Sequence, residues 1–209
     1  MGALASGRPH RRPACGAKHH GGGGLGQPPA DALEGASAVV VSVGSPPLPG
    51  DVEAARKANG ATNVAVIEAA MEAKVGRAVV VGATMPPWLD KVAEGYALGK
   101  RDAFEALGGF ALGGGAVVVK PSAIYGTRHT ESGYPIPLAP LMAPLSYALR
   151  IGRPVTGFVT GLAPSLLDGL LEPPVPVHAV AQTVVDACLE EEYAEGFVAL
   201  GVEAILKRC

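Results

Sequence analysis

Short valine-rich runs alternate along this chain with longer stretches of helical periodicity. Three runs have the profile of buried parallel strands, because each is short and β-branched and is followed by glycine or proline. They are SAVVVSVGS (37–45), RAVVVGAT (77–84) and the start of GAVVVKPSAIYGTR (115–128). Between them, residues 58–76 have apolar side chains at helical spacing up to Gly76, and residues 85–109 begin at proline and end in Gly-Gly. This order predicts right-handed parallel crossovers and a three-layer α/β sheet.

The pattern changes after residue 129. An apolar stretch interrupted by proline and glycine predicts a small cap of short helices over the strand ends, at about residues 130–172. A further strand and helix follow over residues 174–192, and a last strand and terminal helix over residues 196–209. We therefore expect one folded unit over residues 36–209.

Residues 1–35 lack any hydrophobic period and are rich in glycine, proline, histidine and arginine, so we expect them to be disordered. The first 30 residues contain four basic residues and no acidic residue. Such a segment is similar to an organelle transit peptide, and it lacks the continuous apolar core of a secretory signal. A disordered tail and an incorrectly assigned gene start explain it equally well.

Composition limits the partners of the chain. Of its 209 residues, 48% are hydrophobic and 17% are charged, and the net charge of −2 gives no reason to expect nucleic acid as a partner. The three cysteines lie far apart without a C-x-x-C pair, so we expect neither disulfides nor a metal site, and a reducing compartment fits better. No run approaches 18 apolar residues, so we expect no transmembrane segment.

Three residues are candidates for chemistry. Tyr96 and Lys100 stand four apart on a predicted helix, so their side chains point the same way. An ammonium group beside a tyrosine stabilises the phenolate, which predicts a lowered pKa of Tyr96 and suits general acid/base work. Thr84 follows the second strand at the edge where parallel sheets bind ligands, although a threonine there also suits a helix N-cap. The pair alone is common on surface helices.

Four segments together carry a family resemblance. NGATNVAVIEAA, GYALGKRDAFEAL, KPSAIYGTR and EPPVPVHAVAQTVVDA stand in order through most of residues 36–190. They resemble the short-chain dehydrogenase/reductase superfamily, and within it the atypical epimerase/dehydratase-like NAD(P)-binding proteins. The resemblance implies a Rossmann-like fold, an NAD(P) cofactor and catalysis by Tyr96 as the acid/base, with Lys100 holding the nicotinamide ribose and Thr84 orienting the substrate.

The same resemblance implies further cofactor-binding positions. Gly44 matches a glycine near the adenine ribose, and Pro121 would lie beside the nicotinamide. Ser122 follows it, where the family usually has glycine. Asn59 either corresponds to a helix asparagine of active relatives or caps a helix.

The family's first half has no counterpart here. Its members open with a strand, a glycine-rich phosphate loop and two more strands, whereas this chain begins to match at the fourth strand. Gly21, Gly23 and Gly26 have the spacing G-x-G-x-x-G, but no strand precedes them and two prolines follow, so we do not expect a phosphate loop there. We therefore expect weak or no NAD(P) binding. The edge of SAVVVSV would be unpaired, so either upstream sequence is missing from the gene or another chain covers that edge.

Three functions remain open. The first is an NAD(P)-dependent oxidoreductase or epimerase-like enzyme; the second is a non-catalytic NAD(P)-binding accessory or assembly factor in an organelle; the third is a truncated gene product. The apolar residues 135–171 point to a lipophilic, prenylquinone-related substrate, to contact with a lipid surface, or to an ordinary cap. The resemblance to plastid plastoglobule proteins implies a chloroplast location, in plastoglobule or stroma. Similarity to mitochondrial ubiquinone-biosynthesis proteins, and to an accessory subunit of respiratory complex I, leaves the mitochondrion as the alternative.

Overall fold

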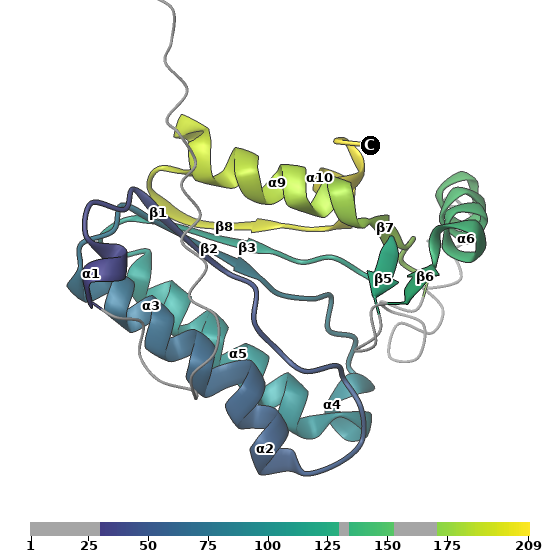
Figure 1. Cartoon of the computed structure of the whole chain (residues 1–209), viewed down its shortest axis with the longest axis horizontal. Helices are drawn as coiled ribbons and strands as arrows, with labels where there is room; N and C mark the ends of the chain where they lie inside the picture. The colour runs from purple at the N-terminus through teal and green to yellow at the C-terminus, as the bar shows by residue number, and fades with distance from the viewer. Residues whose placement is uncertain (1–29, 130–133, 153–170) are drawn as a thin grey trace, which may run out of the picture.

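The computed structural model describes residues 30–129, 134–152 and 171–209, which contain a four-stranded parallel sheet with helices on both faces (Figure 1). The strands stand in the order β1-β2-β3-β8, and each neighbouring pair is parallel. Their bounds are Ala38–Val41, Arg77–Val81, Gly115–Val119 and Gly196–Leu200. The predicted parallel α/β architecture is confirmed for this part of the chain, and the arrangement is compatible with a Rossmann-like fold.

Successive valines of the strands face two separate helical layers. Val80 and Val118 pack against α3 (Thr62–Glu72) and α5 (Glu94–Phe110) on one face of the sheet. Val79 and Val117 pack on the other face, with residues of α9 (Val177–Leu189) and α10 (Val202–Leu206). All four valines are fully buried. The central strands are therefore valine-rich throughout because both of their faces are covered.

The helical segment after β1 starts earlier than the apolar pattern predicts. Asp51 caps α2 (Val52–Arg56), and its carboxylate accepts a hydrogen bond from the Ala54 N–H at 3.1 Å. A π-helical turn, Lys57–Ala61, joins α2 to α3. The sequence predicted that this helix would end at Gly76, but α3 ends at Glu72. Lys74 takes the left-handed conformation after the helix, with φ of 54°.

The second predicted helical segment is divided. α4 (Leu89–Val92) ends at Ala93, and α5 begins at Glu94. The sequence predicted that this helix would end at Gly108–Gly109, but it continues to Phe110. Phe110 is buried in the core, and its packing carries the helix past two glycines whose surroundings are open.

Small elements gather beyond the carboxyl ends of the strands (Figure 1). β4 (Ile124–Tyr125) pairs with β7 (Val175–Pro176), and β5 (Thr127–His129) pairs with β6 (Pro135–Pro137). The helix α6 (Ala139–Ile151) follows β6. The rest of the expected cap, residues 153–170, lies outside the described residues.

Two observations concern the ends of the described part. Ala30–Leu33 form the short helix α1, and Leu33 is buried in the core, although we expected disorder up to residue 35. A short 3₁₀ turn, Glu191–Tyr193, leads from α9 to β8. Within the described ranges, no helix combines the length and the apolarity needed to cross a bilayer.

Candidate functional site

The first turns of α5 place Tyr96 and Lys100 on one buried face of the helix. Their exposed fractions are 8% and 4%. The Lys100 Nζ lies 5.7 Å from the centre of the Tyr96 ring. The sequence spacing therefore brings the two side chains together as predicted, and it brings them together inside the protein rather than on its surface.

The Lys100 ammonium group lies where three segments meet. Its Nζ donates a long hydrogen bond, 3.4 Å, to the Val81 carbonyl at the end of β2. A Cβ built on Gly44 would stand 3.4 Å from this Nζ and 2.5 Å from the Asn59 Oδ1. Only glycine at position 44 lets the loop after β1 approach both groups so closely. Gly44, Asn59 and Lys100 therefore form one polar junction beyond the carboxyl ends of β1 and β2.

Two asparagines hold the loop after β1 against the helices. The Asn59 amide group donates to the Ser45 hydroxyl at 2.8 Å and to the Ala55 carbonyl at 2.9 Å. The Asn63 amide group donates to the Asn59 carbonyl at 2.7 Å and to a carbonyl of the same loop at 3.2 Å. Asn59 lies inside the π-helical turn, so the helix-cap alternative for this residue is wrong. π-Helical turns are frequent at functional sites because they re-aim a side chain out of the regular helix.

The side-chain oxygens of both asparagines are buried and have no hydrogen-bond partner among the described residues. A buried carbonyl oxygen without a partner costs about 1–3 kcal/mol. The Asn59 Oδ1 lies in the junction with Lys100, whose ammonium group makes one weak hydrogen bond within the described part of the chain. The junction therefore offers both an acceptor and unused donors to a small hydroxyl-bearing group.

Glycines bring the two helices of this junction into backbone contact. A Cβ on Gly99 would stand 2.7 Å from the Arg56 carbonyl oxygen and 2.8 Å from the Gly60 nitrogen. A Cβ on Gly95 would collide with the Val52 carbonyl. The absence of side chains at the helix crossing thus brings Asn59 within reach of the Lys100 side chain.

Burial shifts the pKa values of the pair in a direction that the sequence did not predict. Loss of hydration raises the pKa of Tyr96, and loss of hydration lowers the pKa of Lys100. We expected the ammonium group to lower the pKa of Tyr96. In the structure it lies over the ring, and desolvation of the phenolate is the dominant effect. Tyr96 is therefore protonated at neutral pH.

The other predicted site residues lie in the loops that follow β2 and β3. The Thr84 N–H donates to the Pro121 carbonyl at 2.8 Å, and the Thr84 hydroxyl is 3.5 Å from the Lys120 carbonyl. Thr84 does not cap α4, whose N-cap residue is Trp88. The Ser122 hydroxyl donates to the Pro173 carbonyl at 2.6 Å, so it fastens this loop to the segment before β7. The loops after β2 and β3 are therefore hydrogen-bonded to each other at the carboxyl edge of the sheet.

Apolar side chains border Tyr96. Leu89 and Ala93 of the α4 region pack with it, and Met85 and Trp88 lie against this cluster. The Trp88 Nε1 is buried without a partner among the described residues. A substrate reaching Tyr96 would therefore meet an apolar wall with one unused N–H donor.

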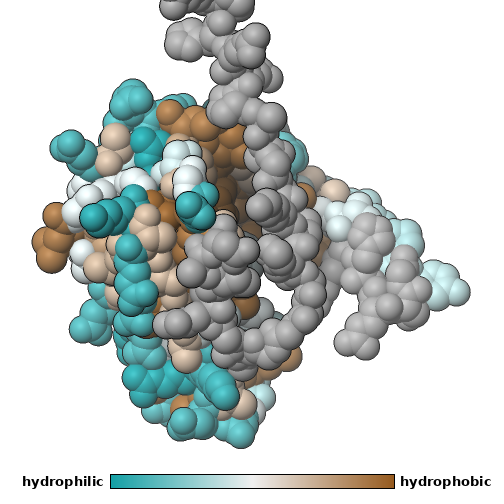
Figure 2. Space-filling model, turned by 60° about the vertical axis from the view of Figure 1, so that its left-hand side comes forward, coloured by the Kyte–Doolittle hydropathy of each residue, from teal (hydrophilic) through white to brown (hydrophobic). Residues whose placement is uncertain are grey.

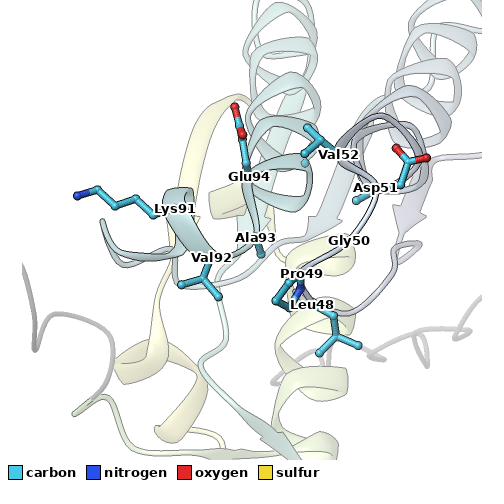
Figure 3. Close-up of a pocket in the computed structure, with 11 residues that line it drawn as sticks. Leu48, Pro49, Gly50, Asp51, Val52, Lys91, Val92, Ala93 and Glu94 are labelled. Carbon is cyan, nitrogen blue, oxygen red and sulfur yellow. The ribbon is translucent and has the colours of Figure 1, made fainter.

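A separate cavity of about 200 Å³ lies on the other side of the start of α5 (Figure 3). It is lined by residues 48–52, Ala55 and residues 91–95. The charged ends of Lys91 and Glu94 extend away from Pro49 and Ala93 in Figure 3. Neither Tyr96 nor Lys100 lines this cavity, so it is not the junction described above.

The sequence analysis named four residues of this part of the structure, Tyr96, Lys100, Gly44 and Asn59, but it did not name Asn63 or Ser45. A signal was available, because Asn59 and Asn63 stand four apart in an otherwise apolar helical segment. Two amides at that spacing share one helix face, and they are buried where the pattern calls for apolar residues. In comparisons with known proteins, no family model matches the chain, and no curated protein matches it either.

Proposed function

We propose that this protein is an NAD(P)-dependent oxidoreductase or epimerase-like enzyme whose acid/base is Tyr96. The observation that carries the proposal is the junction of Lys100, Asn59 and Gly44. A buried ammonium group with one 3.4 Å hydrogen bond lies beside a buried carbonyl oxygen that lacks a described partner. Perturbed, incompletely paired groups at the carboxyl edge of a parallel sheet are typical of ligand sites.

The residues of the junction fit the sugar of a dinucleotide. Ribose hydroxyls both accept and donate hydrogen bonds. Lys100 would donate to them and Asn59 Oδ1 would accept from one, while Gly44 lets the loop after β1 approach both groups closely. When bound, the nicotinamide would supply or accept hydride. Pro121 and Ser122 lie in the loop that we assign to its ring.

Tyr96 would act on the substrate oxygen. Because burial keeps its hydroxyl protonated, it would donate a proton to a carbonyl oxygen as hydride arrives there, and it would take the proton back in the reverse reaction. The nearby Lys100 charge would stabilise the phenolate at that moment. Thr84 would hold the same substrate oxygen from the loop after β2.

The apolar wall around Tyr96 favours a lipophilic substrate of the prenylquinone-related class. We assign the protein to the chloroplast, in plastoglobule or stroma, with the mitochondrion as the alternative. Gly21, Gly23 and Gly26 lie outside the described residues. Weak or no NAD(P) binding remains the expectation from the sequence.

A second function, that of a non-catalytic accessory factor, is favoured by the outer edge of β1. β1 pairs with β2 on one side only among the described residues, and it carries no charged residue, proline or bulge that would protect an edge. Val40 on this strand is 47% exposed. Figure 2 turns this end of the sheet toward the viewer and shows hydrophobic surface between hydrophilic patches. A partner strand that pairs with β1 would cover this edge.

One titration separates these functions. The fluorescence of NADH and of NADPH is followed as the full chain is added, with the Lys100→Met and Lys91→Met variants beside it. The enzyme hypothesis predicts binding that Lys100→Met weakens at least about tenfold, the loss of one charge-assisted hydrogen bond. Lys91→Met removes an exposed lysine and should bind as the natural chain does.

Catalysis is then tested with Tyr96→Phe and a short-chain benzoquinone as hydride acceptor. The variant should bind the cofactor unchanged and lose turnover by about 100-fold or more. Absence of binding for both nucleotides contradicts the enzyme hypothesis and the NAD(P)-binding form of the accessory hypothesis, and leaves an accessory function that depends on a protein partner alone. Unchanged turnover contradicts the role of Tyr96 alone.

A further inference from the structure

We propose that α6 lies in the surface of a lipid layer and anchors the carboxyl edge of the sheet there. This inference does not depend on NAD(P) binding. It starts from the exposed side chains of the helix: Leu141 is 73% exposed, Leu145 47%, Tyr147 67% and Ile151 64%. Exposed apolar side chains that gather in one place mark interaction surfaces.

The apolar surface covers the whole outward half of α6. The helix sequence APLMAPLSYALRI contains one charged residue, Arg150. The one buried residue of the helix is Ser146, whose hydroxyl donates to the Pro174 carbonyl at 2.7 Å. At 100° per residue, the arc opposite Ser146 contains leucine, isoleucine, tyrosine, proline and alanine and no charged side chain. A helix of this composition needs a second apolar surface on its outer side.

The position of α6 favours lipid over a protein groove as that surface. The helix lies at the opposite end of the molecule from α1 (Figure 1), and only Arg150, near its C-terminal end, shares a described pocket with α10. It is convex and projecting, a shape that enters a fluid layer without a matching groove. Ile136 on β6 is 44% exposed and Tyr134 is 72% exposed, so the strand leading into α6 continues the apolar surface.

The length of α6 determines how it would meet the lipid. Its 13 residues span about 20 Å, short of the roughly 30 Å hydrocarbon core of a bilayer. The helix would therefore lie parallel to the surface. Tyrosine rings suit the boundary between acyl chains and headgroups, where the ring is covered and the hydroxyl stays hydrated.

Basic side chains at one end of the helix match anionic headgroups. Arg150 and Lys207 of the C-terminal segment line a pocket of about 340 Å³, together with Glu203 and Leu206. Both basic residues are exposed. Anionic lipids attract such residues by about 1 kcal/mol each near the surface, and salt screens that attraction. Arg150 lies about 40° around the helix from Ser146, so it would reach headgroups from the flank of α6 while the apolar arc meets the acyl chains, and Glu203 offsets part of the basic charge in that pocket.

The test is flotation of the full chain with vesicles of phosphatidylcholine alone and of phosphatidylcholine mixed with phosphatidylglycerol. The natural chain should float with both, and more strongly with the anionic vesicles at low salt. The double variant Leu141→Asp/Leu145→Asp should lose binding at least about tenfold, because two leucines no longer enter the layer. Arg150→Gln/Lys207→Gln should lose only the extra binding to anionic vesicles.

The matched control is Leu112→Asp/Leu189→Asp, which adds the same charge at two leucines that are 92% and 64% exposed outside α6. This control should float as the natural chain does. The proposal is overturned if the natural chain floats with neither vesicle, or if the two double leucine variants bind equally. Light scattering tests whether a second copy of the chain covers α6 instead of lipid. If the natural chain is a dimer and Leu141→Asp/Leu145→Asp is a monomer, α6 is a dimer interface and the lipid proposal is overturned. Equal binding to both vesicle types would overturn the role given to Arg150 and Lys207.

Discussion

Replacing Lys100 with methionine removes a buried ammonium group while keeping the length and most of the apolar contacts of the side chain. The ammonium group has three N–H donors, and the structure gives it one hydrogen bond of 3.4 Å at 4% exposure. Unsatisfied buried donors cost about 1–3 kcal/mol, and charged ones cost more. The attraction to the Tyr96 ring, about 0.5–2 kcal/mol, offsets part of that cost. We expect Lys100→Met to raise the free energy of unfolding by about 1–3 kcal/mol at neutral pH.

Urea and thermal unfolding measure this change. A gain of that size in a chain of 209 residues corresponds to a rise in Tm of roughly 2–12 °C. Lys91→Met, at an exposed lysine, should change the free energy of unfolding by less than about 0.5 kcal/mol. If Lys100→Met is more stable than the natural chain but has lost cofactor binding, then Lys100 contributes to function at a cost in stability.

The pH dependence gives the sign of the effect. Burial lowers the pKa of Lys100 in the folded state below its ordinary value of 10.5. The unfolded chain therefore binds more protons in the interval between the two pKa values, and the stability of the natural chain rises with pH across it. Lys100→Met lacks this rise, so the difference between the two proteins should shrink as the pH increases. The opposite result would refute the reasoning: Lys100→Met is less stable than the natural chain by about 1 kcal/mol or more at neutral pH, and the difference in free energy of unfolding does not change at higher pH. That result would show that the fold itself satisfies the hydrogen bonds of the ammonium group.

Three further experiments test how the helices are held in place. Gly99→Ala should lower the free energy of unfolding by about 1–3 kcal/mol because the new Cβ would collide with backbone atoms. Gly109→Ala lies in open surroundings on the same helix and should raise the free energy of unfolding by up to about 1 kcal/mol. Urea unfolding midpoints distinguish the two variants. A double-mutant cycle on the ion pair between Arg56 and Asp102 (2.7 Å, side chains 52% and 31% exposed) should give a coupling of less than about 1 kcal/mol that falls with salt, and a larger, salt-independent coupling would contradict a solvated pair. Ser146→Ala should cost about 1–2 kcal/mol and speed proteolytic cleavage within α6; equal cleavage rates would show that this hydroxyl does not hold the helix.

The strands were the most predictable part of the fold. Runs such as RAVVVGAT have few alternatives as buried parallel strands, and β2 forms where the sequence places it. Helix ends were less predictable because tertiary packing decides them. Phe110 reaches the core and carries α5 through two glycines, and Lys74 rather than Gly76 takes the left-handed turn after α3.

The sequence predicted that Tyr96 and Lys100 lie close together, but it did not predict the burial of the two side chains. Spacing alone placed Tyr96 and Lys100 on one face of a helix. It could not show that both would be buried, and so the predicted pKa shift of Tyr96 had the wrong direction. The π-helical turn that places Asn59 beside Gly44 is not predicted by a hydrophobic period of 3.6 residues.

The glycine contact between the π-helical turn and α5 sets the distance between the two helices, and that distance in turn sets the separation of Asn59 and Lys100 in the site. No methyl group separates the backbones at Gly60 and Gly99, so Asn59 and Lys100 are placed relative to each other by direct backbone contact rather than by packed side chains. A core that relaxes after a substitution elsewhere would leave this separation almost unchanged. The chain can therefore diversify the apolar wall around Tyr96, and with it the molecules admitted there, while the polar junction keeps its dimensions.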